Sequence, residues 1–134
     1  MKGRKRGFLV DTLGLLRSTV VASAALSEAE MARRLLQRAK EKLTRVLVVF
    51  VDGGFEHRIE TWTLQECGWH VEVVKRDAAK TGWQLLPKRW IVERTIAWVG
   101  RCRSLSKEYD YLPETSESRI YLAMIGLMLR RLAP

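Results

Sequence analysis

The sequence contains few cysteines and no long apolar run. Its two cysteines, Cys67 and Cys102, form no CxxC or cysteine–histidine array, which excludes a disulfide framework and gives no indication of structural zinc. The longest apolar stretch near the C-terminus, residues 120–129, is far shorter than the roughly 20 residues that cross a bilayer. The basic N-terminus leads into a segment broken by Asp11 and Arg17, unlike a signal peptide. We therefore expect a protein of the reducing cytoplasm.

Several catalytic signatures are absent as well. The sequence has no P-loop, no GxGxxG motif and no Ser/His/Asp arrangement, so hydrolase-type nucleophilic catalysis has no support. Its two histidines, His57 and His70, stand alone and are expected to be surface or structural residues rather than metal ligands. No internal repeat is present. The 134 residues therefore predict a single domain, residues 1–134, with one modest core.

Positive charge is the most prominent feature of the composition. The chain has 24 Lys and Arg against 15 Asp and Glu, which gives a net charge of +9 and a sequence pI of about 10.1. Apolar residues make up 47% of the chain and charged residues 29%, which is typical of a folded globular protein. Because an excess of cations in a small domain favours a polyanionic partner, nucleic acid is the first candidate.

The first third of the chain predicts a hairpin and a helix. Residues 7–10 and 15–23 are apolar or β-branched and flank a turn at residues 11–14. Ser27 and Glu30 match a capping box. The apolar residues after it share one helical stripe: Ala32, Leu35, Leu36, Ala39 and Leu43. The other face is basic and is either a solvated or a phosphate-facing surface. Its residues are Arg33, Arg34, Arg38, Lys40 and Lys42.

The rest of the chain alternates between predicted strands and helices. A continuous β-branched run at residues 46–51 indicates a strand buried on both faces. After it the sequence predicts a helix at residues 59–67, a strand at 70–74 and a polar loop at 77–86. A long helix at 89–104, a break at 109–116 that contains Pro113, and a terminal helix up to about residue 132 follow. This order is typical of an α/β layered domain with a mixed sheet and helices on both faces.

Asp52 is the first candidate functional residue. It ends the predicted buried strand, and α/β sheets usually place ligand-binding groups at the carboxyl ends of their strands. Gly53 and Gly54, which follow it, would let a substrate backbone or a metal ion approach closely. The alternative is that Asp52-Gly53-Gly54 forms only a turn.

Glu93 is the second candidate and lies on the predicted helix that begins at Arg89. Helical spacing places it on a face with small residues, away from an apolar stripe that would pack on the sheet. That stripe consists of Ile91, Thr95, Trp98, Cys102 and Leu105. The alternative is an ordinary surface pair between Arg89 and Glu93. Trp90 and Trp98 are interleaved with basic residues here, which suits a nucleic-acid backbone, although tryptophans at this spacing also form cores.

Two carboxylates among basic residues indicate metal chemistry on phosphodiesters. Carboxylate oxygens hold Mg²⁺ or Mn²⁺, and two such ions about 4 Å apart can activate the attacking oxygen and stabilise the leaving oxygen. Asp52 and Glu93 are therefore candidate metal ligands, and a site of this kind usually needs a third acid.

Four blocks of sequence resemble the C-terminal catalytic region of bacterial insertion-sequence DDE transposases. They are the basic KGRKR lead-in with VDTLGL within residues 2–15, VDGGF at 51–55, LPKRWIVERTIAW at 86–98 and LPETSE at 112–117. The resemblance runs nearly from end to end. It implies a ribonuclease-H-like fold, divalent-metal-dependent cleavage at element ends, and strand transfer into double-stranded DNA.

The resemblance also implies roles for individual residues. Asp52 corresponds by position to the second acid of the family and Glu93 to the third, with Mg²⁺ or Mn²⁺ as cofactor. Arg89, four residues before the Glu, matches a position that holds DNA. A basic residue about two turns after the Glu has the same role in the family, and here Arg101 stands next to that position. Arg94 is expected to contact DNA as well.

The chain departs from the family in two places. Phe55-Glu56 stands where a Tyr-Arg pair is common. The family's first Asp lies on a strand upstream of the basic hairpin, so we expect that strand to be missing and the chain to be an incomplete copy. Asp11, the only nearby acid, is expected to be a turn residue, with catalytic substitution as the alternative.

Three functions stay open at this point. The chain is the catalytic part of a DDE transposase, or a non-catalytic remnant that binds DNA or associates with full-length transposase, or an unrelated basic structural protein. The four blocks weaken the third. A missing strand would expose a sheet edge, which favours a homo-oligomer.

Overall fold

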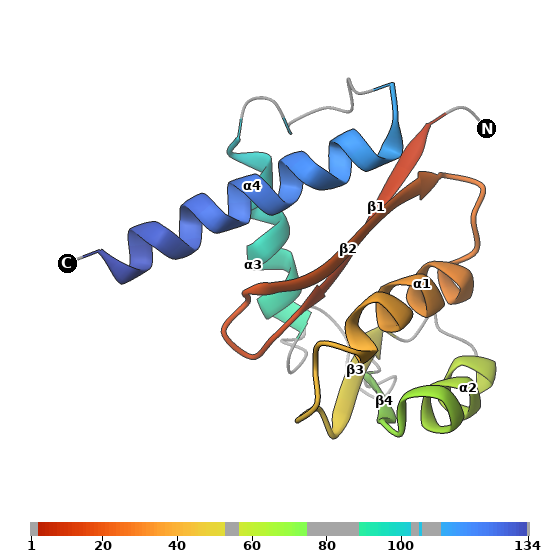
Figure 1. Ribbon diagram of the computed structural model, residues 1–134. Helices are drawn as coiled ribbons and strands as arrows, with labels where there is room; N and C mark the ends of the chain where they lie inside the picture. Colours follow the sequence, from red (N-terminus) through yellow and green to blue (C-terminus); the bar gives the residue numbers. More distant parts are fainter. Residues whose placement is uncertain (1–2, 53–56, 75–88, 103–104, 106–110, 134) are drawn as a thin grey trace, which may run out of the picture.

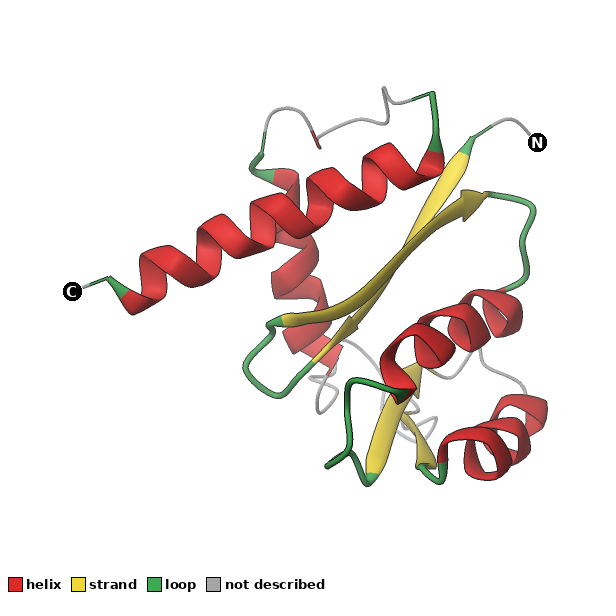
Figure 2. Cartoon of the chain, viewed as in Figure 1, coloured by secondary structure: helices red, strands yellow, loops and turns green. Residues whose placement is uncertain are grey.

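The computed structural model describes residues 3–52, 57–74, 89–102, 105 and 111–133 (Figure 1). Helices and strands alternate along most of this chain, as Figure 2 shows, so the predicted α/β composition is confirmed. The elements are β1 (Arg4–Val10), β2 (Leu16–Ser23), α1 (Glu28–Lys40), β3 (Val48–Asp52), α2 (His57–Cys67), β4 (His70–Val74), α3 (Arg89–Gly100) and α4 (Pro113–Leu132). The polar loop predicted at residues 77–86 lies outside the described residues.

The predicted hairpin is present and consists of β1 and β2. The strands pair antiparallel, with Arg4 opposite Ser23 at the open end and a register shift near the turn. Gly14 lies in the turn with φ +80°, a conformation that glycine adopts without steric cost. A Cβ at Gly14 would also stand only 3.0 Å from Thr95 Oγ1, so the turn packs closely on α3.

α1 begins where the capping box predicts. The Ser27 hydroxyl accepts a hydrogen bond from Glu30 N at 3.2 Å, which satisfies one of the free N–H groups of the first turn. The buried residues repeat at helical spacing: Met31, Ala32, Leu35, Leu36 and Ala39. Val20 and Ala22 of β2 pack against Met31 and Leu35, so α1 covers one face of the hairpin.

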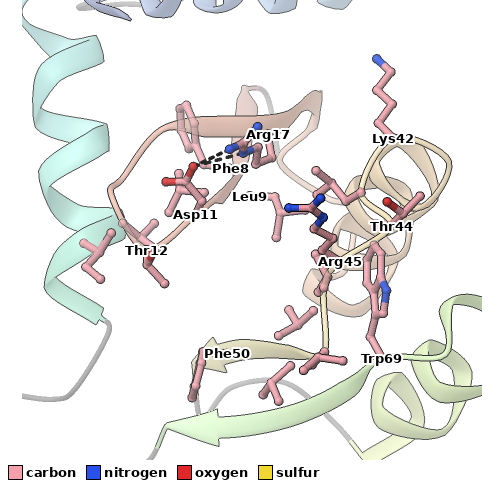
Figure 3. Close-up of a pocket in the computed structure, with 18 residues that line it drawn as sticks. Phe8, Leu9, Asp11, Thr12, Arg17, Lys42, Thr44, Arg45, Phe50 and Trp69 are labelled. Atoms are coloured by element: carbon pink, nitrogen blue, oxygen red, sulfur yellow. Dashed lines mark hydrogen bonds and ion pairs between the residues drawn. The ribbon is translucent and has the colours of Figure 1, made fainter. Parts of the chain in front are cut away.

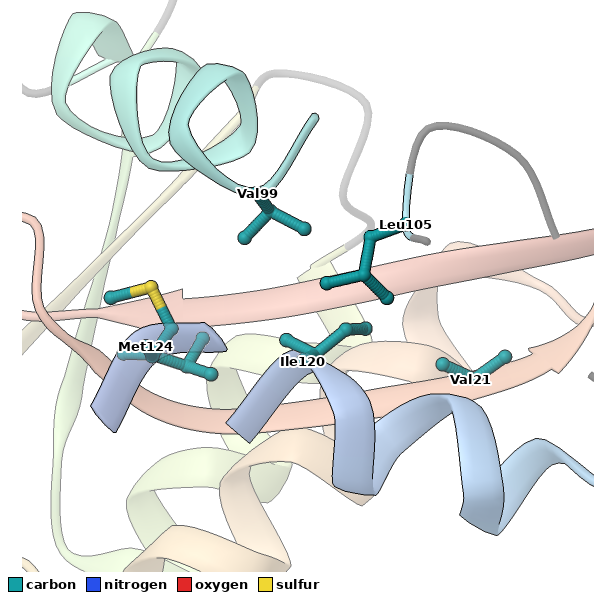
Figure 4. Close-up of a cluster of buried hydrophobic side chains, with 6 residues drawn as sticks. Val21, Val99, Leu105, Ile120 and Met124 are labelled. Carbon is teal, nitrogen blue, oxygen red and sulfur yellow. The ribbon is translucent and has the colours of Figure 1, made fainter. Parts of the chain in front are cut away.

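Helices α3 and α4 cover the opposite face of the hairpin. Val21 points to the other side of β2 from Val20 and joins residues of both helices in one apolar cluster (Figure 4). The buried members of this cluster are Leu16, Val21, Val99, Leu105, Ile120 and Met124. The predicted placement of helices on both faces is therefore confirmed for the hairpin.

β3 and β4 form a second sheet, connected through α2. They pair parallel, with Val48 opposite His70 and Asp52 opposite Val74. One face of this sheet packs on α1 and α2 through a cluster whose buried members are Leu36, Ala39, Val49 and Trp69. The prediction that β3 is buried on both faces is wrong, because Val48 and Phe50 on the other face are 41% and 42% exposed.

The two sheets are separate. The sequence predicts one mixed sheet, whereas the structure has an antiparallel and a parallel pair that are not joined by strand pairing among the described residues. α1 lies between them (Figure 1) and holds them together. Its Met31 and Leu35 pack on the hairpin, while its Leu36 and Ala39 pack on the β3 side.

The last two helices differ from the prediction at their ends. α3 ends at Gly100 instead of continuing to residue 104. α4 begins at Pro113, which the sequence analysis places in a break. Proline fits the first position of a helix because the N–H that it lacks would have no helical partner there.

The outer edge of β2 is closed by side chains instead of a strand. Thr19 N donates to Tyr121 Oη at 3.1 Å, and Val21 N donates to Glu117 Oε1 at 2.9 Å. The other oxygen of Glu117 pairs with Arg38 Nη1 at 2.7 Å, and this Nη1 also donates to Thr19 O at 2.8 Å. Arg38 therefore belongs to neither a free solvated face nor a phosphate-facing one. Side chains of α1 and α4 satisfy the main chain of this edge.

Candidate metal and DNA site

Asp52 lies at the carboxyl end of β3. It is the last residue of the strand and stands opposite Val74, the last residue of β4. Both parallel strands therefore end at the same edge of their sheet, which is where α/β proteins gather ligand-binding groups. The Asp52 side chain and residues 53–56, including the Phe55-Glu56 pair, lie outside the described part of the chain.

Glu93 lies on the exposed face of α3. Ala97 and Gly100, one and two turns further along the helix, are exposed as well. The buried residues of the opposite stripe are Ile91, Thr95 and Val99. The predicted separation of an open Glu93 face from an apolar stripe is confirmed, with Val99 rather than the half-buried Trp98 at its centre.

One groove is lined by residues of both β3 and α3. It has a volume of about 510 Å³ and lies between the hairpin and β3 (Figure 3). Phe50 of β3 and Val92 of α3 both line it. Phe50 precedes Asp52 by two residues and Val92 directly precedes Glu93, so the two candidate acids belong to elements that meet at the same groove.

The hairpin turn anchors the middle of α3. Thr95 Oγ1 donates to Gly14 O at 2.6 Å, and Arg94 Nη2 donates to Leu13 O at 2.9 Å. These contacts fix the helix that carries Glu93 relative to the hairpin. The contact between Arg94 and Leu13 O is not indicated by the sequence, and the DNA contact expected of Arg94 stays a prediction.

A second contact that the sequence analysis missed joins α3 to α4. The guanidinium carbons of Arg94 and Arg131 lie 4.7 and 4.3 Å from the centroid of the Trp98 ring. A cation–π contact at an exposed site contributes about 0.5 to 1 kcal/mol. No sequence signal pairs Trp98 with Arg131, because the two residues belong to different helices.

The remaining predicted DNA-binding residues mark the two ends of α3. Arg89 is the first residue of the helix, and its side chain lies outside the described part of the structure. Arg101 follows the last residue and is exposed. A cation at that end also complements the helix dipole, so Arg101 has a structural role whether or not it contacts DNA.

Asp11 serves the hairpin turn. Its Oδ1 accepts hydrogen bonds from Leu13 N at 2.9 Å and from Leu15 N at 3.0 Å. Its Oδ2 pairs with Arg17 Nη2 at 2.8 Å. Both carboxylate oxygens are engaged within the turn, which agrees with the expected turn residue and gives no support to catalytic substitution.

Comparison with known protein families adds a line of evidence that is independent of this geometry. A family model described as the transposase DDE domain matches residues 1–129. The chain belongs to this family. The resemblance drawn from the four sequence blocks is thereby confirmed. No curated protein and no solved structure matches the chain.

Transposase DDE domains generally use divalent metal ions and act on DNA. The donor chemistry of this DDE domain fits such an ion, since Asp52 and Glu93 offer the hard carboxylate oxygens that Mg²⁺ and Mn²⁺ take. Within the described residues, no cluster of three or more His, Cys, Asp and Glu side chains could hold a metal ion.

Both cysteines of the DDE domain are free thiols. Burial raises the pKa of the Cys67 thiol above its ordinary value, opposed by the charge of Lys40 and reinforced by that of Glu66. Cys67 is therefore protonated at neutral pH and is not an activated nucleophile. Among the helices that the structure describes, none is long and apolar enough to cross a membrane.

Proposed function

We propose that this DDE domain carries out metal-dependent DNA strand cleavage and strand transfer, with Asp52 and Glu93 as metal ligands. One observation carries the proposal: β3 and α3, the elements that carry the two acids, meet at a single groove. Placement of one acid at the end of a strand and of the other on a helix that lines the same groove also supports a ribonuclease-H-like arrangement.

The two acids would act from different positions in the domain. Asp52 sits where a strand ends, and its carboxylate would hold Mg²⁺ or Mn²⁺ at the sheet edge. Glu93 is open to solvent, so a DNA backbone can approach it without a change in the packing of α3. A bound cation supplies charge that activates the attacking oxygen and stabilises the leaving oxygen of an in-line displacement.

The basic residues near Glu93 would hold the DNA. Arg89 and Arg101 stand at the two ends of α3, and Arg94 lies between them next to Glu93. Arginines on one helix can follow a phosphate backbone, and the net charge of +9 strengthens attraction over a longer range. Binding of this kind is expected to weaken steeply as salt is added.

Strand transfer is the experiment that tests the catalytic proposal. The protein is incubated with pre-cleaved double-stranded DNA ends, a target plasmid and Mn²⁺, and joined products are measured on gels. We expect transfer by the unaltered chain and its loss in Asp52→Asn and Glu93→Gln, with DNA binding retained. Glu41→Gln, which changes an exposed acid at the end of α1, is the matched control and should leave transfer unchanged.

The outcomes separate catalysis from binding. Absence of transfer by the unaltered protein, together with retained DNA binding, would contradict the catalytic proposal and identify a binding-only domain. Transfer that survives Glu93→Gln would contradict the assignment of Glu93 as a metal ligand.

DNA binding is tested through its salt dependence. Arg101→Ala should reduce the slope of log affinity against log salt concentration by the amount expected for about one phosphate contact, because each neutralised phosphate releases counterions. Arg34→Ala on α1, which removes an exposed arginine far along the chain from α3, is the control. Equal slopes for Arg101→Ala and the unaltered protein would contradict a phosphate contact by Arg101.

A further inference from the structure

One tryptophan and two arginines form a cluster where the hairpin turn, α3 and α4 meet. The guanidinium carbon of Arg94 lies 4.7 Å from the centroid of the Trp98 ring, and that of Arg131 lies 4.3 Å from it. Arg94 precedes Trp98 by four residues on α3, whereas Arg131 belongs to the last turn of α4. The cluster therefore exists only in the folded chain, because its residues come from two helices.

The hairpin turn packs against this cluster. Arg94 Nη2 donates a hydrogen bond to Leu13 O at 2.9 Å. A Cβ at Gly14 would stand 3.1 Å from Arg94 Nη2 and 3.4 Å from Trp98 Cζ3, so both side chains lie close to the glycine. These contacts fix the Trp98 ring, which in turn supports the guanidinium of Arg131.

The hydrogen-bond donors of Arg131 stay available to a ligand. A guanidinium that stacks on a ring uses its flat face, whereas its N–H donors lie in its plane. Arg131 is exposed, and within the described residues its side chain makes neither a hydrogen bond nor an ion pair. Trp98 thus holds the charge of Arg131 in place without using its donors.

Positive charge is concentrated around the Trp98 ring. Because Arg94 and Arg131 both contact this ring, their guanidinium carbons are closer together than the Debye length of about 10 Å at about 0.1 M salt. The two cations therefore repel each other, and an anion bound beside them would offset the repulsion. Arg101, seven residues after Arg94, continues the same side of α3 and is exposed. The cluster therefore favours an anionic ligand.

A phosphate of DNA is the anion that suits this position. The planar guanidinium of arginine matches phosphate oxygens in two-point contacts. Glu93, the candidate metal ligand, directly precedes Arg94 on α3. A phosphate held by the cluster would therefore belong to DNA that lies along the helix of the candidate acid.

We propose that Arg131, supported by Trp98 and acting with Arg94, contacts a phosphate of the duplex DNA on which the domain acts. This inference rests on the proposed function, since it takes DNA as the substrate, and it adds a contact from α4. A long side chain that is already held in place loses less conformational entropy on binding. Arg131 should therefore contribute more to DNA affinity than an unsupported surface arginine does.

The salt dependence of DNA binding tests this contact. Fluorescence anisotropy of a labelled DNA duplex is measured in EDTA, without metal ions, at salt concentrations from about 50 to 200 mM. Arg131→Gln should weaken binding about tenfold and reduce the slope of log affinity against log salt concentration by about 0.9. Arg131→Lys keeps the charge and should restore the slope. Arg130→Gln removes the neighbouring exposed cation and is the matched control, which should leave the slope unchanged.

A second measurement uses the chain without any arginine substitution. Tryptophan labelled with fluorine is incorporated, and fluorine NMR follows the protein as duplex DNA is added. The Trp98 resonance should shift, whereas that of Trp69, which is buried in the cluster between β3 and α1, should not. Trp98→Phe and Trp69→Phe assign the two resonances. This result does not depend on the folding of an arginine variant.

The contrary results separate this contact from the proposed function. An unchanged slope for Arg131→Gln is the result of a purely structural role and would overturn the contact, as would a Trp98 resonance that DNA leaves in place. An equal loss of slope in Arg130→Gln would overturn the assignment to Arg131. Absence of DNA binding by the unaltered chain would overturn this inference and the proposed function together. The expected slopes without strand transfer would support the Arg131 contact and contradict only the catalytic proposal.

Discussion

Glu117 is expected to be the most important charged residue for the stability of this fold. It comes from α4, is 9% exposed, and accepts a hydrogen bond from Val21 N of β2. Its second oxygen pairs with Arg38 of α1. One carboxylate therefore connects the two helices that cover opposite faces of the hairpin, and Glu117→Ala removes both connections at once.

The expected cost follows from the two contacts. An N–H left without a partner costs about 1 to 3 kcal/mol, and the pair with the half-exposed Arg38 adds about 1 kcal/mol. Glu117→Ala should therefore lower the free energy of unfolding by about 2 to 4 kcal/mol, out of about 5 to 15 for a domain. Glu117→Gln keeps an acceptor for Val21 N and should cost only about 1 kcal/mol.

Urea denaturation followed by tryptophan fluorescence measures the free energies of unfolding of these variants. Native-state amide exchange at Val21 tests whether the lost stability arises at this hydrogen bond. Glu114→Ala changes an exposed acid on the same helix and serves as the control. Val21 exchange should accelerate in Glu117→Ala more than in Glu117→Gln. If Glu117→Ala, Glu117→Gln and Glu114→Ala had equal stability, the main-chain hydrogen bond would not be the stabilising contact, and the reasoning would be refuted.

Three further predictions concern packing and ionisation. Gly7→Val should destabilise the hairpin by about 1 to 3 kcal/mol in urea denaturation, because a Cβ at this position would stand 2.8 Å from the sulfur of the buried Met31. Gly126→Ala, which has open space around it, should instead stabilise α4 by about 0.5 to 1 kcal/mol. Thr95→Val removes the hydrogen bond to the hairpin turn and should cost about 1 kcal/mol in the same assay. Burial raises the pKa of the Cys67 thiol in the folded state, so folding favours the protonated thiol. The stability that the protonated thiol contributes is therefore complete at neutral pH and is lost as the pH rises through the pKa of the folded state. Unfolding measured against pH should show this loss, and Cys67→Ser should remove it.

Local signals in the sequence predicted most of the secondary structure. The start of α1 depends on Ser27 and Glu30, three residues apart, and the turn of the hairpin depends on Asp11 and Gly14. Each of these interactions lies within a few residues of chain, so composition and spacing alone indicate it. Gly68, which follows α2 with φ +72°, adopts a conformation that favours glycine and is likewise determined by a local feature of the chain.

Contacts between distant residues account for what the sequence did not predict. Arg38 and Glu117 are separated by most of the chain, and nothing near Arg38 distinguishes it from the solvated cations beside it. The error at β3 has a similar cause. Its β-branched residues are compatible with burial on both faces, but Val48 and Phe50 lie on the face opposite the buried Val49, line the groove and are 41% and 42% exposed.

The position of the groove relates the two elements that carry the candidate acids. Val48 and Phe50 line the groove two to four residues before Asp52, and Val92 lines it directly before Glu93. A ligand that occupied the groove would therefore contact both segments that set the separation of the two carboxylates. Since a metal ion favours one separation, a ligand that favoured the same arrangement would strengthen metal binding, and the metal would strengthen binding of that ligand by the same factor.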